Sequence, residues 1–108
     1  MKKVQKISCV NSAAFVMNFS VCYIDENGET IVSRWNSGNY PVGQERICNL
    51  AVDVPDIPEG AIVWPRVNAV LGKSQDGTLK LIYDGKCQLT AVYRVTGTTL
   101  NYNVKIIG

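Results

Sequence analysis

The segment from residue 35 to residue 41 holds the residue types best suited to binding a ligand. Trp35 and Tyr40 enclose a run of small polar residues that includes Asn36 and Asn39. Aromatic faces pack on the C–H surface of a sugar ring, and amides pair with its hydroxyls, which is the mixture that a ligand site needs. We therefore predict that these four residues bind a neutral glycan. The alternative is an ordinary loop, with Trp35 in the core and Tyr40 packed on the end of the domain.

Carboxylates form a second candidate for chemistry, because they gather in two loops. One loop holds Asp25, Glu26 and Glu29, and the other holds Asp53, Asp56 and Glu59. Paired carboxylates can cleave glycosides, and clustered carboxylate and amide oxygens can bind calcium. Loop carboxylates more commonly cap nearby amides, and neither loop has the ligand order of an EF-hand. We expect no catalytic pair, no metal site and no cofactor.

The sequence contains no histidine. This excludes the serine–histidine and cysteine–histidine nucleophile systems and all imidazole metal sites. The four cysteines, at positions Cys9, Cys22, Cys48 and Cys87, lie at least thirteen residues apart, which does not fit a zinc site with paired thiolates. We expect buried thiols, with a disulfide as the alternative. The chain is predicted to be a binding protein and not an enzyme.

Charge is sparse and lacks a basic stripe. The net charge of +2 comes largely from Lys2, Lys3 and Lys6, and the arginines are scattered along the chain. Phosphate backbones require clustered cations, so we expect no nucleic-acid partner. The first ten residues have no apolar run of the length of a signal peptide, and no segment could span a membrane. These features predict a cytoplasmic protein, or one secreted without a classical signal peptide.

Asparagine supplies much of the polarity that charged residues usually provide. Charged residues make up 19% of the chain, below the usual level of about 25%. A neutral surface repels copies of itself less than a charged surface does. We therefore expect a homo-oligomer and a neutral polar ligand.

Alternating large apolar residues from residue 15 to residue 23 predict the main strand that must position these groups. They are Phe15, Met17, Phe19, Val21 and Tyr23, and only a pleated strand places such a period on one face. The opposite face carries Val16, Asn18, Ser20, Cys22 and Ile24 and has no charge. A strand face of this kind needs a second layer or a partner to cover it.

Turn residues divide the chain into about eight strands. The expected strands are 4–10, 14–24, 30–35, 45–53, 62–71, 79–84, 87–95 and 100–107. Asn27 and Gly28 favour a type I′ hairpin turn, and Pro65 requires an edge position or a bulge. Short strands at this spacing predict one all-β domain over residues 1–108, a two-sheet antiparallel β-sandwich of jelly-roll or Greek-key type.

Parity along the strands then predicts the core. The expected interior residues are Phe15, Met17, Phe19, Val21, Trp64, Leu81, Ile82, Val92, Leu100 and Val104. Tyr83, Tyr93 and Tyr102 are expected to direct their hydroxyls toward the rim, since tyrosine keeps its oxygen hydrogen-bonded when its ring is buried.

Three functions fit these features. The first is a lectin-like, carbohydrate-binding module that uses loops at one end of the sandwich. The second is a membrane-active or toxin-like lipid-binding protein, in which surface aromatics and the face of Val16, Asn18, Ser20 and Cys22 dock to lipid or to copies of the chain. The third is a structural, self-assembling protein that pairs edge strands such as the Pro65 element. The partner is thus predicted to be a glycan or a lipid surface.

Overall fold

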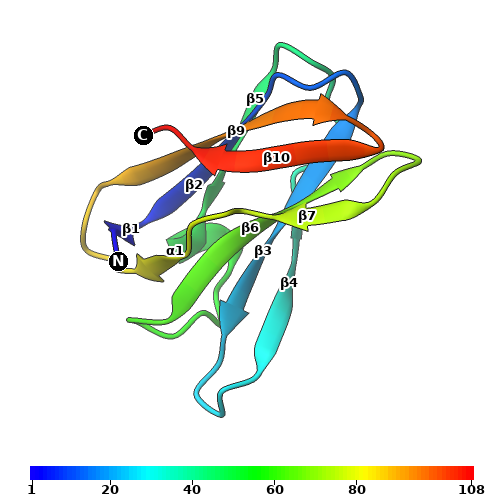
Figure 1. Cartoon of the computed structure of the whole chain (residues 1–108). Coiled ribbons are helices and arrows are strands. Elements are labelled where there is room, and N and C mark those ends of the chain that lie inside the picture. Colours follow the sequence, from blue (N-terminus) through cyan, green and yellow to red (C-terminus); the bar gives the residue numbers. More distant parts are fainter.

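The computed structural model describes residues 1–108 and consists of two β-sheets packed face to face (Figure 1). The first sheet contains β1 (Lys3–Val4), β3 (Met17–Ile24), β4 (Thr30–Asn36), β6 (Ile62–Ala69), β7 (Ser74–Asp76) and β8 (Leu81–Tyr83). The second contains β2 (Lys6–Asn11), β5 (Glu45–Asn49), β9 (Thr90–Thr98) and β10 (Asn101–Ile106). A single helical turn, α1 (Leu50–Asp53), follows β5. The expected all-β two-sheet sandwich is confirmed.

The sheets are mixed, which differs from the purely antiparallel arrangement expected. The first sheet has the order β1-β8-β6-β3-β4, with β7 also pairing β6, and the second has the order β10-β9-β2-β5. The pairs β1–β8 and β2–β9 are parallel. Parallel neighbours require a long connection. Here the N-terminal strands lie beside strands from the C-terminal third of the chain.

The N-terminal strand predicted over 4–10 divides at Gln5 between the two sheets. Lys3 and Val4 pair with β8, whereas the residues from Lys6 onward pair with β5 and β9. The main-chain amide of Gln5 donates to the Leu89 carbonyl, and the side-chain amide of Gln5 donates to the Gly85 carbonyl. Gln5 therefore joins the sheets, and the apolar pattern around it continues without a break because both halves bury side chains.

The strand predicted over 45–53 is wrong in its second half. β5 ends at Asn49, and α1 begins at Leu50. The Asn49 side chain accepts a hydrogen bond from the Ala51 amide, and the Asp53 carboxylate accepts one from the Asn49 amide. Such reciprocal bonds satisfy free amides at a helix start, so this asparagine–aspartate pair ends the strand.

Pro65 lies within the first sheet at the point where one neighbouring strand gives way to another. On one side it pairs with Val21 of β3, and on the other side β6 pairs first with β8 and then with β7. The Pro65 carbonyl accepts from the Gly77 amide on this second side. The missing proline amide therefore faces the gap between β8 and β7, and β6 is an interior strand and not an edge strand.

The hairpin turn between β3 and β4 is present, but it is not of type I′. Gly28 has a φ of 80°, whereas Asn27 does not have a positive φ. The Asp25 carboxylate accepts from the amides of Asn27 and Glu29 instead. This carboxylate holds the turn in place of the second positive φ angle that type I′ requires.

Half of the predicted core is confirmed. Met17, Phe19, Val21, Leu81 and Val104 are buried between the sheets. Phe15, Ile82 and Val92 are only half-buried, and Leu100 is wrong because it is 87% exposed.

Trp64 is buried as expected, but on the outer face of the first sheet. It pairs with Cys22 across β3 and β6, and neither residue belongs to the cluster of core residues between the sheets. The predicted rim tyrosines have buried rings, and the hydroxyls of Tyr93 and Tyr102 donate to main-chain carbonyls.

Candidate functional site

The structure does not bring the four predicted ligand-binding residues onto one surface. Tyr40 is 1% exposed, and its hydroxyl donates to the Cys9 carbonyl over 2.8 Å. Trp35 is half-buried and contacts the Phe19 ring edge-to-face at 5.1 Å between centroids. Asn36 and Asn39 are exposed. The two amides thus lie on the surface while the aromatic rings turn toward the core, and ligand binding by the four residues stays a prediction.

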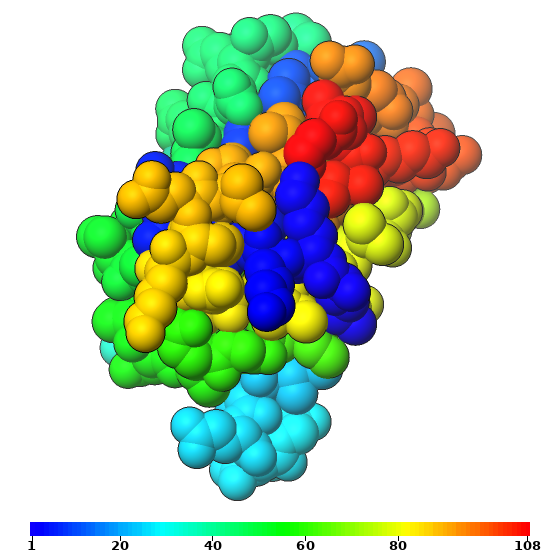
Figure 2. Space-filling view, turned by 90° about the vertical axis from the view of Figure 1, so that its left-hand side faces the viewer, coloured from blue at the N-terminus to red at the C-terminus, as the bar shows by residue number.

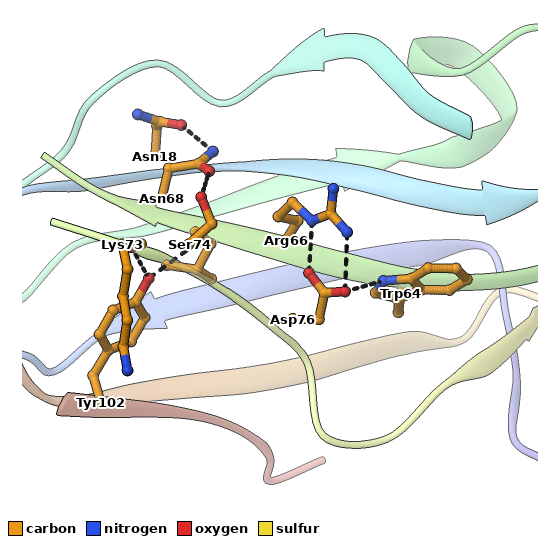
Figure 3. A network of polar contacts seen from close by, with 9 residues as sticks. Asn18, Trp64, Arg66, Asn68, Lys73, Ser74, Asp76 and Tyr102 are labelled. Atoms are coloured by element: carbon orange, nitrogen blue, oxygen red, sulfur yellow. Dashed lines mark hydrogen bonds and ion pairs between the residues drawn. The ribbon is translucent and has the colours of Figure 1, made fainter. Parts of the chain in front are cut away.

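Asn36 and Asn39 belong to a chain of amide groups across the outer face of the first sheet. The side-chain oxygen of Asn18, Oδ1, accepts from the side-chain amides of Asn36, at 3.0 Å, and Asn68, at 2.9 Å. The side-chain amide of Asn18 donates in turn to the side-chain oxygen of Asn39 at 3.0 Å. Ser74 extends the chain by donating to Asn68 (Figure 3). We call Asn18, Asn36, Asn39, Asn68 and Ser74 the amide chain.

This arrangement explains the uncharged face of β3. Near the start of β3, Asn18 and Ser20 form hydrogen bonds with side chains of neighbouring segments. The Ser20 hydroxyl accepts from the Asn36 side-chain amide at 3.0 Å. Further along β3, Cys22 pairs with Trp64 of β6, whose indole donates to Asp76 (Figure 3). No third layer is needed, because neighbouring side chains satisfy the polar groups of this face.

The loops at one end of the sandwich are almost free of charge. They are the segments 11–18, 36–44, 69–74 and 96–103, and their only charged residue is Lys73. Backbone hydrogen bonds join them: the Gly43 amide donates to Asn11, the Ala14 amide to Gly97 and the Val70 amide to Val16. We call these four segments the low-charge end.

Apolar side chains project from the low-charge end into solvent. Leu71, at the tip of the β6–β7 hairpin, is 100% exposed, and Leu100, at the tip of the β9–β10 hairpin, is 87% exposed. The two tips lie side by side (Figure 1), since a Cβ added to Gly72 would sit 3.2 Å from the Thr99 carbonyl oxygen. Val16, Val42 and Val70 are also exposed here. Adjacent exposed leucines are unusual enough on a protein surface to indicate an interaction site.

Leu71 also has a strained backbone. Its φ of 64° makes it the one residue other than glycine with a positive φ. The left-handed region disfavours a leucine by roughly 1–2 kcal/mol relative to a right-handed conformation. Asparagine or glycine would fit this position at lower energy. A strained, fully exposed leucine points to a functional constraint.

Acidic residues occupy the opposite end of the sandwich. The antiparallel pairing of β3 with β6 places Met17 beside Ala69 at the low-charge end and Tyr23 beside Val63 at the other end. The protruding hairpin at the bottom of Figure 2 follows Tyr23 and carries Asp25, Glu26 and Glu29. Asp53, Asp56, Glu59 and Asp84 lie in the α1–β6 segment and after β8. Most carboxylates therefore lie at one end of the sandwich, and the segments at the other end are nearly free of charge.

Several carboxylates have local structural partners. Asp25 and Asp53 accept from backbone amides of their own turns, and Glu59 accepts from the Gly85 amide at 2.8 Å. No three histidine, cysteine, aspartate or glutamate side chains lie close enough together to hold a metal ion. All four cysteines are free thiols, and burial raises the pKa of Cys9 and of Cys48 well above the ordinary thiol value.

Sequence patterns missed the leucines of the low-charge end. Leu100 follows Gly97-Thr98-Thr99 and Leu71 precedes Gly72, so both are apolar residues next to turn residues. Leu100 was assigned to the core because it was counted as the first residue of a strand. An apolar residue at a hairpin tip is the signal that could have found both.

Comparison with known proteins shows no match to any family model and none to a curated protein. Solved structures do resemble the chain. The membrane-binding domain of pneumolysin aligns over 95% of both chains with 14% identity and a TM-score of 0.48. Listeriolysin O, at 15% identity and a TM-score of 0.47, aligns with 94% of this chain and 22% of its own length.

A non-hemolytic pneumolysin from Streptococcus pneumoniae strain ST306 is similar as well, with 14% identity and a TM-score of 0.47 over 94% of this chain. The chain spans less than a quarter of the length of this pneumolysin and of listeriolysin O. Within the chain, the only helix is the four-residue α1, and no helix is long and apolar enough to cross a bilayer.

Proposed function

We propose that this protein is a lipid-binding module that docks on a membrane through its low-charge end, with Leu71 and Leu100 entering the apolar layer. The observation that carries the proposal is the pair of exposed leucines on adjacent hairpin tips. Water disfavours such side chains, whereas a bilayer interface buries them.

The energy available fits reversible docking. Complete transfer of one leucine side chain from water stabilises the bound state by about 1.5–3 kcal/mol. Two leucines therefore contribute about 3–6 kcal/mol, and a 1 mM affinity corresponds to roughly 4 kcal/mol. Val16 and Val70, which are partly exposed beside them, add smaller amounts.

The distribution of charge supports the same orientation. The segments of the low-charge end contain Lys73 and no carboxylate, and the Arg46 guanidinium reaches them by donating to the Ser37 carbonyl, whereas most of the acidic residues lie at the far end. Desolvating carboxylates against a membrane is costly, and an anionic leaflet repels them. The neutral end can approach a bilayer without either penalty.

Vesicle flotation tests the proposal. Phosphatidylcholine vesicles, alone and with cholesterol or an anionic lipid, should carry the native protein upward in a density gradient. Leu71→Asn combined with Leu100→Gln should reduce the floated fraction at least tenfold. Val52→Gln, which removes a 71% exposed valine from α1 at the other end, is the matched control and should float like the native protein.

Stability separates this role from a structural one. Asparagine tolerates a positive φ, so Leu71→Asn should leave the free energy of unfolding unchanged or raise it slightly. Undiminished flotation of the double variant, or no flotation of the native protein with any of the lipid mixtures, contradicts the proposal.

Glycan recognition is a second candidate function, favoured by the amide chain. Asn18 holds Asn36, Asn39 and Asn68 in fixed orientations on an exposed face, and oriented neutral amides suit sugar hydroxyls. Asn39→Ala should abolish binding on a glycan array, while Asn103→Ala, on an exposed face of β10, should not. Binding that survives Asn39→Ala, or an array without any bound glycan, argues against this second role.

In either role the protein is proposed to bind without catalysis and to gain strength from several copies. Weak sites gain avidity when they are linked. Sedimentation at increasing protein concentration tests the predicted homo-oligomer, which should appear as a rising sedimentation coefficient.

A further inference from the structure

A groove of about 430 Å³ lies between the edge strand β4 and the segment that contains α1 and Pro55. Its walls include Tyr23, Ile31, Trp35, Val54, Pro55 and Asp56. The volume falls within the range of small-molecule sites, about 300–1,000 Å³. The groove runs along β4 from Ile31, which pairs with Tyr23 at the acidic end of the sheet, to Trp35, and no residue of the low-charge end lines it.

Strand β4 forms one wall of the groove. Ile31, Ser33 and Trp35 share one face of the strand, and Val32 and Arg34 on its other face also line the groove. The edge-to-face contact with Phe19 fixes the Trp35 ring, and Tyr23 is 7% exposed. The groove thus presents two aromatic side chains held by the core.

Carboxylates face this wall. Asp53 and Asp56 line the groove, and an adjoining hollow that shares Tyr23, Ile31 and Asp56 adds Asp25 and Glu26. Arg34 is the one cation of the lining, and it forms no ion pair, because the only salt bridge of the protein joins Arg66 to Asp76. Burial raises the pKa of Tyr23, and the charges of Asp56 and Asp25, which line the same hollow, raise it further.

Ser33 supplies a further, independent observation. Its hydroxyl oxygen is buried and has no hydrogen-bond partner, and it is the only side-chain polar atom of the protein in that state. Buried polar atoms are normally paired, so each exception calls for an explanation. Because this oxygen is closed to solvent, a ligand N–H can become its partner only if the wall of the groove moves at Ser33.

We propose that this groove binds a small organic cation with an apolar body, such as an alkylammonium or arylammonium compound. The ammonium group would lie between the Asp56 carboxylate and the aromatic side chains, since cations bind both to carboxylates and to aromatic faces. The apolar body would pack against Ile31, Val54 and Pro55. The site does not depend on membrane docking, because it lies away from Leu71 and Leu100.

Nuclear magnetic resonance with the probe benzylammonium, whose N–H groups can donate to the protein, tests the site. The protein has two tryptophans, so Trp35→Phe assigns the indole resonance of Trp35. We expect the probe to shift this resonance with a Kd on the order of 1 mM. Benzyl alcohol, a neutral compound with the same ring, should bind at least fivefold more weakly.

Three variants test the positions of the cation and of its apolar body. Asp56→Asn should weaken probe binding at least fivefold, and Glu29→Gln, an exposed carboxylate outside the groove, should not change it. Ile31→Asn should also weaken binding by introducing a polar group into the apolar wall. The absence of any shift, or equal binding of benzyl alcohol, overturns the proposal.

Flotation of the same Asp56→Asn variant separates the sources of the cation. Unchanged flotation on phosphatidylcholine vesicles assigns the groove to a free cation. A loss would place the choline group of the lipid in the groove and would contradict docking through the low-charge end alone. Failure of the groove would leave the leucine variants unaffected, so the two proposals fail independently.

Discussion

Gly72 and Thr99 lie in contact between the tips of two hairpins that are far apart in the sequence. A Cβ added to Gly72 would sit 3.2 Å from the Thr99 carbonyl oxygen and 3.0 Å from the Ala69 Cβ. Only a residue without a side chain fits this space comfortably. The contact sets the spacing of Leu71 and Leu100, and so the shape of the surface proposed to meet the membrane.

Gly72→Val is therefore expected to push the hairpins apart. Overpacking of this kind destabilises a protein by about 1–3 kcal/mol. We expect a lower urea midpoint and, at a concentration of urea where both proteins stay folded, a reduced floated fraction. Gly28→Asn, at the acidic hairpin, meets no atom within 4 Å and serves as the control. Flotation of Gly72→Val equal to that of the native protein would show that each tip docks alone.

Tyr102 joins the same hairpins through its hydroxyl. This group shares its one proton between the Lys73 carbonyl at 2.5 Å (Figure 3) and the Val67 carbonyl at 3.1 Å. The ring contacts Phe15 at 4.8 Å between centroids. Tyr102→Phe keeps the ring and removes the donor, which should lower the free energy of unfolding by about 0.5–1.5 kcal/mol.

Urea denaturation measures this loss, and hydrogen exchange locates it. Faster exchange should appear in β7 and at the Leu71 tip. Asn103→Ala, on the exposed face of the same strand, controls for a change in β10 itself. A stability equal to that of the native protein would show that water replaces the hydroxyl without loss.

The sequence predicted β3 and its buried face because the alternation there has one physical explanation. Met17, Phe19 and Val21 bury their side chains between the sheets as period 2 requires. The opposite face was less predictable. Its amide chain depends on Asn36, Asn39 and Asn68, which reach Asn18 only through strand pairing and the β4–β5 loop.

Parity failed where the backbone leaves the strand geometry. Leu100 follows the same alternation as the core residues of β10, but it lies at the hairpin tip. Outside a strand, alternation does not determine which side chains are buried. Trp35 and Tyr40 are close in sequence, yet a strand end and a loop separate their rings. Two residues that are close in sequence can point their side chains in different directions. The composition of this segment therefore did not determine whether the two aromatic rings share one surface.

Thiol reactivity should divide the cysteines into two classes. Burial raises the pKa of Cys9, Cys22 and Cys48, and only the thiolate is nucleophilic. Cys87 is partly exposed, and its thiol donates to the Asp84 carbonyl at 3.3 Å. A disulfide reagent with an absorbing leaving group should modify one thiol in the native protein and four in urea.

Cys87→Ser identifies the reactive thiol, because it should abolish the native-state reaction and leave three thiols in urea. Rapid reaction of two or more thiols in the folded protein would contradict the buried positions of the other cysteines.

Acid should weaken the protein through Asp76. Its carboxylate accepts from Arg66 Nε at 2.7 Å, Arg66 Nη2 at 3.2 Å and the Trp64 indole at 3.0 Å (Figure 3). The hydrogen bond from Arg66 lowers the pKa of Asp76 in the folded state, and that from Trp64 adds to the effect. The stabilisation is therefore complete above the pKa of an unfolded aspartate, roughly 3.9, and is lost as the pH falls through the lower folded value.

Asp76→Asn removes this titration while preserving the shape of the side chain. The difference in the free energy of unfolding between native protein and variant should be largest near neutral pH and should shrink below about pH 4. Urea denaturation at neutral pH and at about pH 2.5 measures it. Glu26→Gln, on the exposed β3–β4 hairpin, controls for the loss of a negative charge. A difference that stays constant over this range would show that Asp76 acts through its shape and hydrogen bonds alone, without a contribution from its charge.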